Sequence, residues 1–213
     1  MTFLMAAMLV GGLTGLDGTY HESRSGQQEG QGVQKAAAAG KSTMKVHYID
    51  VGQGSAVLVQ SGVHFMLIDG GDSDASSKVV SYLKRQKVKK LDYVVVSHYD
   101  SDHLNGVVGA LNVFKVQRVI APAYTADSRV YESYCNIIAQ KKIATTRPKV
   151  GKKYKLGKAR FTILAPNSSG YVDENNYSIA LKLVNGKNRF VITLARPTPR
   201  ALPWLAALRS RKQ

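Results

Sequence analysis

The chain has 213 residues, 44% of them hydrophobic, and its 30 Lys and Arg against 14 Asp and Glu give a formal net charge of +16. This length suits one domain with a real core rather than two, and the single cysteine excludes an internal disulfide and any cysteine-rich zinc site. The positive charge favours contact with a polyanion, such as nucleic acid or an anionic membrane surface, although solubility alone would also account for it.

The first residues form an apolar run from Met1 to Leu13, which is too short to span a bilayer and matches the core of a signal peptide. No Lys or Arg precedes the run. We expect residues 1–18 to be a signal peptide or an apolar leader and the protein to be exported, with a cytoplasmic location as the alternative. No stable membrane span is expected. Residues 19–43 are rich in Gly, Gln, Ser and Ala and are predicted to be a disordered linker, because they cannot bury enough apolar surface to fold.

A folded domain is predicted to begin at Met44, where apolar residues start to alternate as they do in strands. The pattern predicts strands over 44–51 and 55–59, with a glycine-containing turn between them. A short buried strand over 65–68 ends at Asp69, which is followed by two glycines that let the backbone turn tightly. Three strands therefore open the domain.

Helices and strands alternate in the middle of the chain, which indicates a layered α/β fold. Residues 76–88 carry apolar residues at helical spacing and predict an amphipathic helix that covers one face of a sheet. The run over 93–96 is entirely apolar, as in an interior strand. Further elements are helices over 104–114 and 130–142 and a strand over 118–121. Cys135, in the second of these helices, is predicted to be buried.

The remainder is rich in strand patterns, which we predict over 154–156, 159–164, 177–184 and 189–194. The last two are joined by Asn185 and Gly186, a strong signal for a hairpin.

The densest chemical signal lies directly after the predicted strand over 93–96. Two imidazoles and two carboxylates fall within six residues there: His98, Asp100, Asp102 and His103. Divalent metals bind imidazole nitrogen and carboxylate oxygen, so the first two residues can hold one ion and the last two a second. Two such ions can activate a bridging water. The alternative is a polar turn in which Asp102 caps the following helix.

This spacing resembles the metal-binding motif of the metallo-β-lactamase superfamily, with Asp100 where many members have a histidine. Together with the segments 49–54 and 67–71, it resembles the ComEC-like branch, the soluble domain of competence DNA-uptake proteins and their free-standing relatives. The resemblance covers roughly residues 44–194. It implies the αββα sandwich of that superfamily, of which this chain would supply the N-terminal part. It does not favour β-lactam hydrolysis.

The resemblance further implies a hydrolase that uses a divalent metal, as two ions of Zn or Mn, and metal-bound hydroxide to cleave a phosphodiester or nucleic-acid-type substrate. It gives His98, Asp100, Asp102 and His103 as metal ligands, with Asp102 also the candidate catalytic residue. Asp69 would orient the metal loop from behind the ligands. Asp50 and Gln53 would lie near the site, although turn-forming roles are as well supported for them and for Asn175, Asn176 and Ser178. His47 and His64 are interpreted as structural.

The chain departs from the family pattern after Thr193. The ComEC-like pattern continues there into Thr-Gly-Asp, whose aspartate bridges the metals, and later into His-His-Gly-Ser. Residues 195–213 instead contain several prolines and a basic end. We therefore expect a truncated or frameshifted chain, with the second half of the sandwich incomplete and 195–213 an aberrant basic tail. Loss of the later ligands would leave the metals weakly held.

Two other functions stay open. One is an exported module that binds DNA or another polyanion without catalysis, through Lys84, Arg85, Lys87, Lys89, Lys90, Lys152, Lys153 and Lys155. The other is a non-functional fragment. The oligomeric state is not indicated by the sequence.

Overall fold

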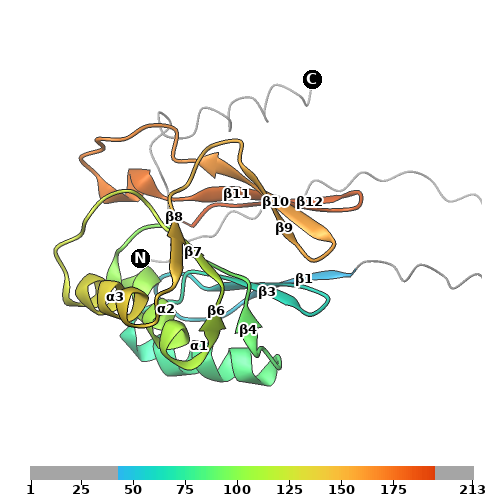
Figure 1. Ribbon diagram of the computed structural model, residues 1–213, viewed down its shortest axis with the longest axis horizontal. Helices are drawn as coiled ribbons and strands as arrows, with labels where there is room; N and C mark the ends of the chain where they lie inside the picture. The colour runs from blue at the N-terminus through green and yellow to red at the C-terminus, as the bar shows by residue number, and fades with distance from the viewer. Residues whose placement is uncertain (1–42, 195–213) are drawn as a thin grey trace, which may run out of the picture.

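The computed structural model describes residues 43–194, which form three layers (Figure 1). A six-stranded sheet lies in the middle, with helices on one face and a four-stranded sheet on the other. The described residues thus supply an αββ arrangement of the predicted αββα sandwich. The leader predicted over 1–18, the linker over 19–43 and the tail over 195–213 lie outside the described residues, apart from residue 43.

The six-stranded sheet has the order β1-β2-β3-β5-β7-β8. β1, β2 and β3 are antiparallel neighbours, and β3, β5, β7 and β8 run parallel. The carboxyl ends of the parallel strands therefore meet at one edge of the sheet. The strand bounds are β1 Met44–Tyr48, β2 Val57–Ser61, β3 His64–Ile68, β5 Tyr93–Val95, β7 Arg118–Ile120 and β8 Ala144–Thr146.

Both faces of this sheet are buried, because successive residues of a strand point to opposite sides. Leu67 and Val94 pack toward the helices, whereas Met66 and Val95 pack toward the second sheet. A strand buried on both faces needs an unbroken apolar sequence, which explains why the run over 93–96 shows no polar alternation.

Three helices cover the outer face of the six-stranded sheet: α1 Ser73–Arg85, α2 Ser101–Val113 and α3 Arg129–Gln140. α1 begins three residues earlier than predicted, because the carboxylate of Asp72 accepts the Ser73 N–H and caps it. α2 also begins earlier, so Asp102 lies in its first turn and does not cap it. The predicted burial of Cys135 was wrong. This cysteine is exposed, because α3 packs through Tyr134 and Ile137 instead.

The four-stranded sheet is antiparallel throughout, in the order β12-β11-β10-β9. Its strands are β9 Lys153–Leu156, β10 Ala159–Ala165, β11 Ala180–Asn185 and β12 Asn188–Ile192. The predicted hairpin at Asn185 and Gly186 is confirmed, with Gly186 at φ +60°. The strand predicted to start at Tyr177 was wrong at its beginning. The 3-10 helix η1 Glu174–Tyr177 stands there, capped by Asp173.

Hydrogen bonds from backbone N–H groups join the two sheets at opposite ends. Ala159 N–H donates to Ser61 Oγ, and Ile179 N–H donates to the carbonyl of Ser97, at the start of the predicted metal loop. The short strands β4 Lys90–Leu91 and β6 Lys115–Val116 pair only with each other. No helix within residues 43–194 is long and apolar enough to cross a membrane.

Candidate metal centre

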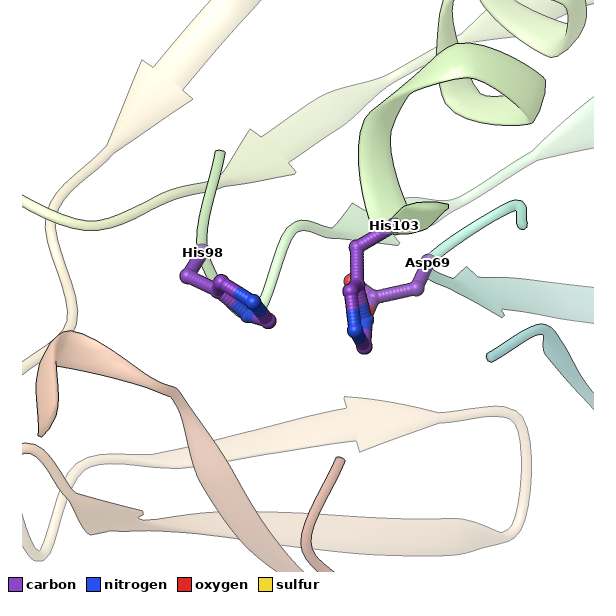
Figure 2. Close-up of side chains that lie close together, drawn as sticks. All are labelled: Asp69, His98 and His103. Carbon is purple, nitrogen blue, oxygen red and sulfur yellow. The ribbon is translucent and has the colours of Figure 1, made fainter. Parts of the chain in front are cut away.

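Two histidines and a buried aspartate meet where β3 and β5 end and α2 begins (Figure 2). β3 leads into Asp69, β5 leads into His98, and the first turn of α2 presents His103. Each of the three offers a ligand atom within 4.8 Å of the other two. The two imidazole rings lie 4.1 Å apart, centroid to centroid. The parallel arrangement of β3 and β5 thus brings together residues that are far apart in the sequence.

Asp69 is fully buried and holds this arrangement together. Its carboxylate accepts the Ser97 N–H at 2.7 Å and the Ser97 hydroxyl on its two oxygens. It also faces Nδ1 of His103 at 2.7 Å, so the proton of that imidazole lies on Nδ1. Asp69 therefore leaves Nε2 of His103 as the nitrogen that can bind a metal.

The same carboxylate fixes the orientation of His98 through Ser97. Because the Ser97 hydroxyl donates to Asp69, its oxygen must accept the proton of His98 Nδ1, which lies 2.9 Å away. Ser178 Oγ stands 3.4 Å from the same nitrogen. Nε2 of His98 is then an acceptor, and it is buried without a hydrogen-bond partner. A buried acceptor left unpaired is costly, and a cation would satisfy it.

The exposed side of the cluster carries the two carboxylates of the predicted loop. Asp100 Oδ2 lies 3.3 Å from His98 Nε2, and Asp102 Oδ2 lies 3.8 Å from His103 Nε2. The structure therefore brings all four predicted ligands together, in the predicted pairs. Two imidazole nitrogens beside carboxylate oxygens fit a divalent ion such as Zn or Mn. The assignment of these residues as ligands stays a prediction.

The two histidines differ in their acid–base behaviour. Burial and the neighbouring His103 lower the pKa of His98, which favours the neutral imidazole that binds metals. Burial alone would lower the pKa of His103 as well, but the hydrogen bond and the negative charge of Asp69 outweigh it and raise that pKa. His103 is therefore protonated more readily than His98. A metal that binds Nε2 of His103 must displace a proton from that nitrogen.

Glycines let two loops close on the first turn of α2. Gly70 N–H donates to the carbonyl of His103 at 2.8 Å, and Ser55 N–H donates to that of Asp102 at 3.3 Å. A Cβ on Gly54 would overlap the Asp102 carbonyl, and one on Gly70 would overlap the α2 backbone. The glycines that the sequence marked as turn residues are thus also needed for close packing against the metal loop.

The remaining predicted residues lie in different places. Asp50 is exposed, where it accepts the Gly52 N–H at 3.2 Å and faces Lys78 at 3.5 Å, and neither contact reaches the histidines. These two contacts lower the pKa of Asp50. Gln53 is exposed as well.

The two histidines interpreted as structural lie outside the cluster. His47 contacts the Tyr82 hydroxyl at 3.0 Å, and His64 contacts Asp92 at 3.3 Å.

Three residues near the site were missed or left open by the sequence. Ser97 links Asp69 to His98, and Ser178 reaches the same imidazole from the second sheet. Tyr99 pins the loop, because its N–H donates to the Tyr124 hydroxyl and its own hydroxyl donates to the Pro122 carbonyl. Hydroxyl groups occur in every kind of turn and strand, so no sequence signal distinguished Ser97 and Tyr99. Ser178 was named on the resemblance, with its role left open.

A cavity of about 400 Å³ opens beside the loop. Its lining comes from the metal loop, the start of α3 and η1: Tyr99, Asp100, Ser101, Asp102, Ala126, Asp127, Ser128 and Glu174. Within residues 43–194, every carboxylate except Asp92 lies at this end of the molecule, after a strand end or at a helix start: Asp50, Asp69, Asp72, Asp74, Asp100, Asp102, Asp127, Glu132, Asp173 and Glu174. Such a concentration of negative charge attracts cations.

Comparisons with known proteins agree with this geometry. The family model of the metallo-beta-lactamase superfamily matches residues 49–166, more than half of the chain. Recombination protein 2 of Haemophilus influenzae is 26% identical over 158 residues, covering 72% of this chain and 18% of that protein. ComE operon protein 3 of Bacillus subtilis is 25% identical over 169 residues, covering 70% of this chain and 22% of that protein. The chain thus spans about a fifth of the length of these relatives.

Solved structures show the same fold. A metallo-beta-lactamase mutant from Cronobacter sakazakii superimposes with a TM-score of 0.51 at 15% identity, covering 72% of this chain and 61% of that one. The metallo-beta-lactamase fold protein YhfI from Bacillus subtilis gives 0.50 at 20% identity, with 70% and 61% covered.

Proposed function

The chain belongs to the metallo-beta-lactamase superfamily, and from this premise we propose that it is a metal-dependent hydrolase of phosphodiester bonds in nucleic acid. The paired arrangement of His98 with Asp100 and of His103 with Asp102 carries the proposal. Relatives named recombination protein 2 and competence protein ComA, the latter from Neisseria gonorrhoeae, support a nucleic-acid substrate. The basic net charge is compatible with such a polyanion.

The residues of the chain divide the work between holding a metal and handling protons. We assign two ions of Zn or Mn to the loop, which would activate water and polarise the phosphodiester when bound. His98 presents Nε2 to the site because Ser97 occupies its Nδ1, and His103 presents Nε2 because Asp69 occupies its Nδ1. Asp102 lines the cavity, and its side chain is 24% exposed, so it can accept the proton that the attacking water loses.

Metal content is the first test of this proposal. We expect the full chain to bind Zn or Mn when it is equilibrated with the ion, as equilibrium dialysis followed by elemental analysis measures. The double variant Asp102→Ala, His103→Ala should lose it. His64→Ala is the matched control, because this histidine also contacts a carboxylate but lies at the start of β3, at the opposite edge of the sheet. No metal in the unaltered chain, or equal metal in all three, would count against the site.

Turnover is the second test. The metal-loaded chain should cleave bis(p-nitrophenyl) phosphate and a labelled oligonucleotide. Cleavage should stop when the metal is removed with a chelator and should return when the metal is restored. Binding of the oligonucleotide without turnover in the loaded protein would instead support the non-catalytic module.

A further inference from the structure

The outer face of the four-stranded sheet carries a regular array of cations. Strand pairing places four residues side by side in one row across the sheet, in the order Lys155, Arg160, Val184 and Arg189. The next row, two residues along the strands, holds Lys153, Thr162 and Lys182. Partners within a row are about 5 Å apart and the rows about 7 Å apart. We call Lys153, Lys155, Arg160, Lys182 and Arg189 the basic sheet face.

These five cations have no partner charges among the described residues. β9, β10, β11 and β12 contain no Asp or Glu, and no ion pair involves any of the five. Four of them are exposed and Lys182 is half-buried. None of the three described helices lies on this face, as Figure 1 shows. Like charges placed directly opposite each other, as Lys155 and Arg160 are, destabilise a sheet unless an anion lies over them.

The chemistry of the face favours a phosphate backbone over a membrane. Stable attachment of a basic surface to a membrane takes a second element besides its charge, such as apolar side chains that enter the lipid or a lipid chain. The large apolar residues that are exposed lie elsewhere, and none is on these four strands: Tyr48, Val63, Val113, Val150 and Val172. The charged residues of this face are all cations, beside the half-buried Val184 and Thr162, and their spacing matches a chain of regularly spaced phosphates.

We propose that the basic sheet face is a docking surface for the sugar–phosphate backbone of a nucleic acid, separate from the metal centre. The choice of nucleic acid rests on the function proposed above, but binding requires no metal and no turnover. Of the two rows, the one that contains Lys182 lies nearer to the metal centre. Lys182 is four residues, or about 13 Å of extended chain, from Ser178, and Ser178 contacts His98. A nucleic-acid strand bound to this face is positioned to continue toward the loop that carries His98 and Asp100.

Binding in the absence of metal tests the surface alone. We would titrate the full chain, in chelator, into a fluorescent oligodeoxythymidine and follow anisotropy over a salt series. The variant Arg160→Thr, Lys182→Thr, Arg189→Thr should bind at least about tenfold more weakly, and the slope of log K against log salt should become shallower by about 2, as expected for three lost phosphate contacts on a single strand. Threonine suits exposed strand positions.

The matched control removes the same charge elsewhere. Lys84→Gln, Lys89→Gln, Lys115→Gln changes three exposed lysines on the helical side and should alter binding less than about twofold. An equal loss in both variants would show that net charge alone matters and would overturn the proposal. So would retention of full affinity in the threonine variant. Thermal unfolding checks that each variant folds, and Lys153→Thr, Lys155→Thr replaces the first variant if it does not.

Two further measurements distinguish the proposed docking surface from the proposed hydrolase function. Asp102→Ala, His103→Ala should keep full oligonucleotide affinity in chelator, and a loss there would place binding at the metal end and overturn the proposal. If the threonine variant loses affinity for anionic phosphatidylglycerol vesicles but not for the oligonucleotide, the face is a membrane surface and the proposal is wrong. Absence of metal or turnover with binding intact would contradict the hydrolase function alone.

Discussion

Asp69 accepts hydrogen bonds from three groups while fully buried, and through them it sets the tautomers of both histidines. A carboxylate has enough acceptor positions for this, and a neutral amide does not, because half of an amide is a donor. The residue also sits at φ +54°, a left-handed conformation that Asn tolerates. These properties make Asp69→Asn a change in charge and hydrogen bonding at nearly constant shape.

We expect Asp69→Asn to weaken metal affinity about 10- to 100-fold, because the amide NH₂ faces donors and releases the two imidazoles from their metal-binding orientation. Competition with a chromophoric chelator measures the change. Asp72→Asn is the control, since this carboxylate caps α1 and contacts neither histidine. Equal affinity in wild type and Asp69→Asn would show that the imidazoles are oriented by the backbone alone.

Asp92 offers a test of stability against pH, away from the metal centre. Burial would raise its pKa, but Lys90 at 3.1 Å, the Phe65 N–H and His64 outweigh burial and hold the pKa below its ordinary 3.8. A carboxylate with a depressed folded pKa stabilises the protein above its unfolded pKa, and this contribution is lost as the pH falls through the folded pKa.

Asp92→Asn should therefore lower the free energy of unfolding by about 1–2 kcal/mol at neutral pH, because a charged hydrogen-bond acceptor is lost. The difference from wild type should shrink below about pH 4 and vanish once Asp92 is protonated. Urea titrations at several pH values measure it. The exposed Asp50→Asn should change stability much less, and a difference that persists in acid would contradict the assigned cause.

Individual site residues were predictable to the extent that their chemistry is rare in structural roles. His98, Asp100, Asp102 and His103 are dense enough to be noticed, and the structure places them together. The role of Ser97 could not be predicted from the sequence, because it depends on the hydrogen bond that the Ser97 hydroxyl donates to Asp69. Cys135 was placed on the wrong side of α3 because a small apolar residue fits either face of an amphipathic helix.

At the scale of the elements, α2 packs closely against the loop after β3. The backbones of Gly70 and Gly106 approach so closely that a Cβ on either would overlap the other. Gly106 N–H also donates to the carbonyl of Gly71 at 3.3 Å. α2 carries Asp102 and His103 in its first turn, so its position determines the geometry of these two candidate ligands.

Gly106→Ala should force α2 away from this loop, at a cost of about 1–3 kcal/mol in the free energy of unfolding, and should reduce metal binding. Gly109→Ala is the matched control on the same helix. Its Cβ would meet the Ser76 hydroxyl, which is free to rotate, and alanine favours a helix. Denaturant titration and elemental analysis measure both effects. Equal stability of the two variants would show that the close approach is easily relieved.

Within residues 43–194, periodicity located all three α-helices and nearly every long strand, but not the shortest elements. β4 and β6 have two residues each, which is too few for any alternation to appear. The start of α1 was misplaced because its side-chain cap, Asp72, lies outside the apolar pattern. Tyr177 was assigned to a strand because an aromatic residue before an apolar run favours one, whereas Asp173 caps a 3-10 turn there.

At the scale of the whole molecule, the layers were predictable and the surface was not. The alternation of strands with helices and the resemblance carried by the metal motif indicated the sandwich, which the structure confirms for residues 43–194. The basic sheet face depends on strand register, because a shift by one residue would turn Lys155 and Arg160 inward. Register is set by cross-strand contacts that a single sequence does not reveal.

The gathering of the carboxylates around the metal centre gives the described part of the chain, residues 43–194, a permanent dipole moment. Under the proposed binding of a nucleic acid, this dipole would experience a torque near the polyanion, so the protein would rotate before contact and meet the polymer with its cationic sides while the metal centre turns away. Under the two proposals above, the basic sheet face would first hold the polymer, which would then have to bend or slide to bring a bond to the metal centre. Raising the ionic strength would weaken the torque as well as the attraction, so encounters at high salt would be fewer and more randomly oriented.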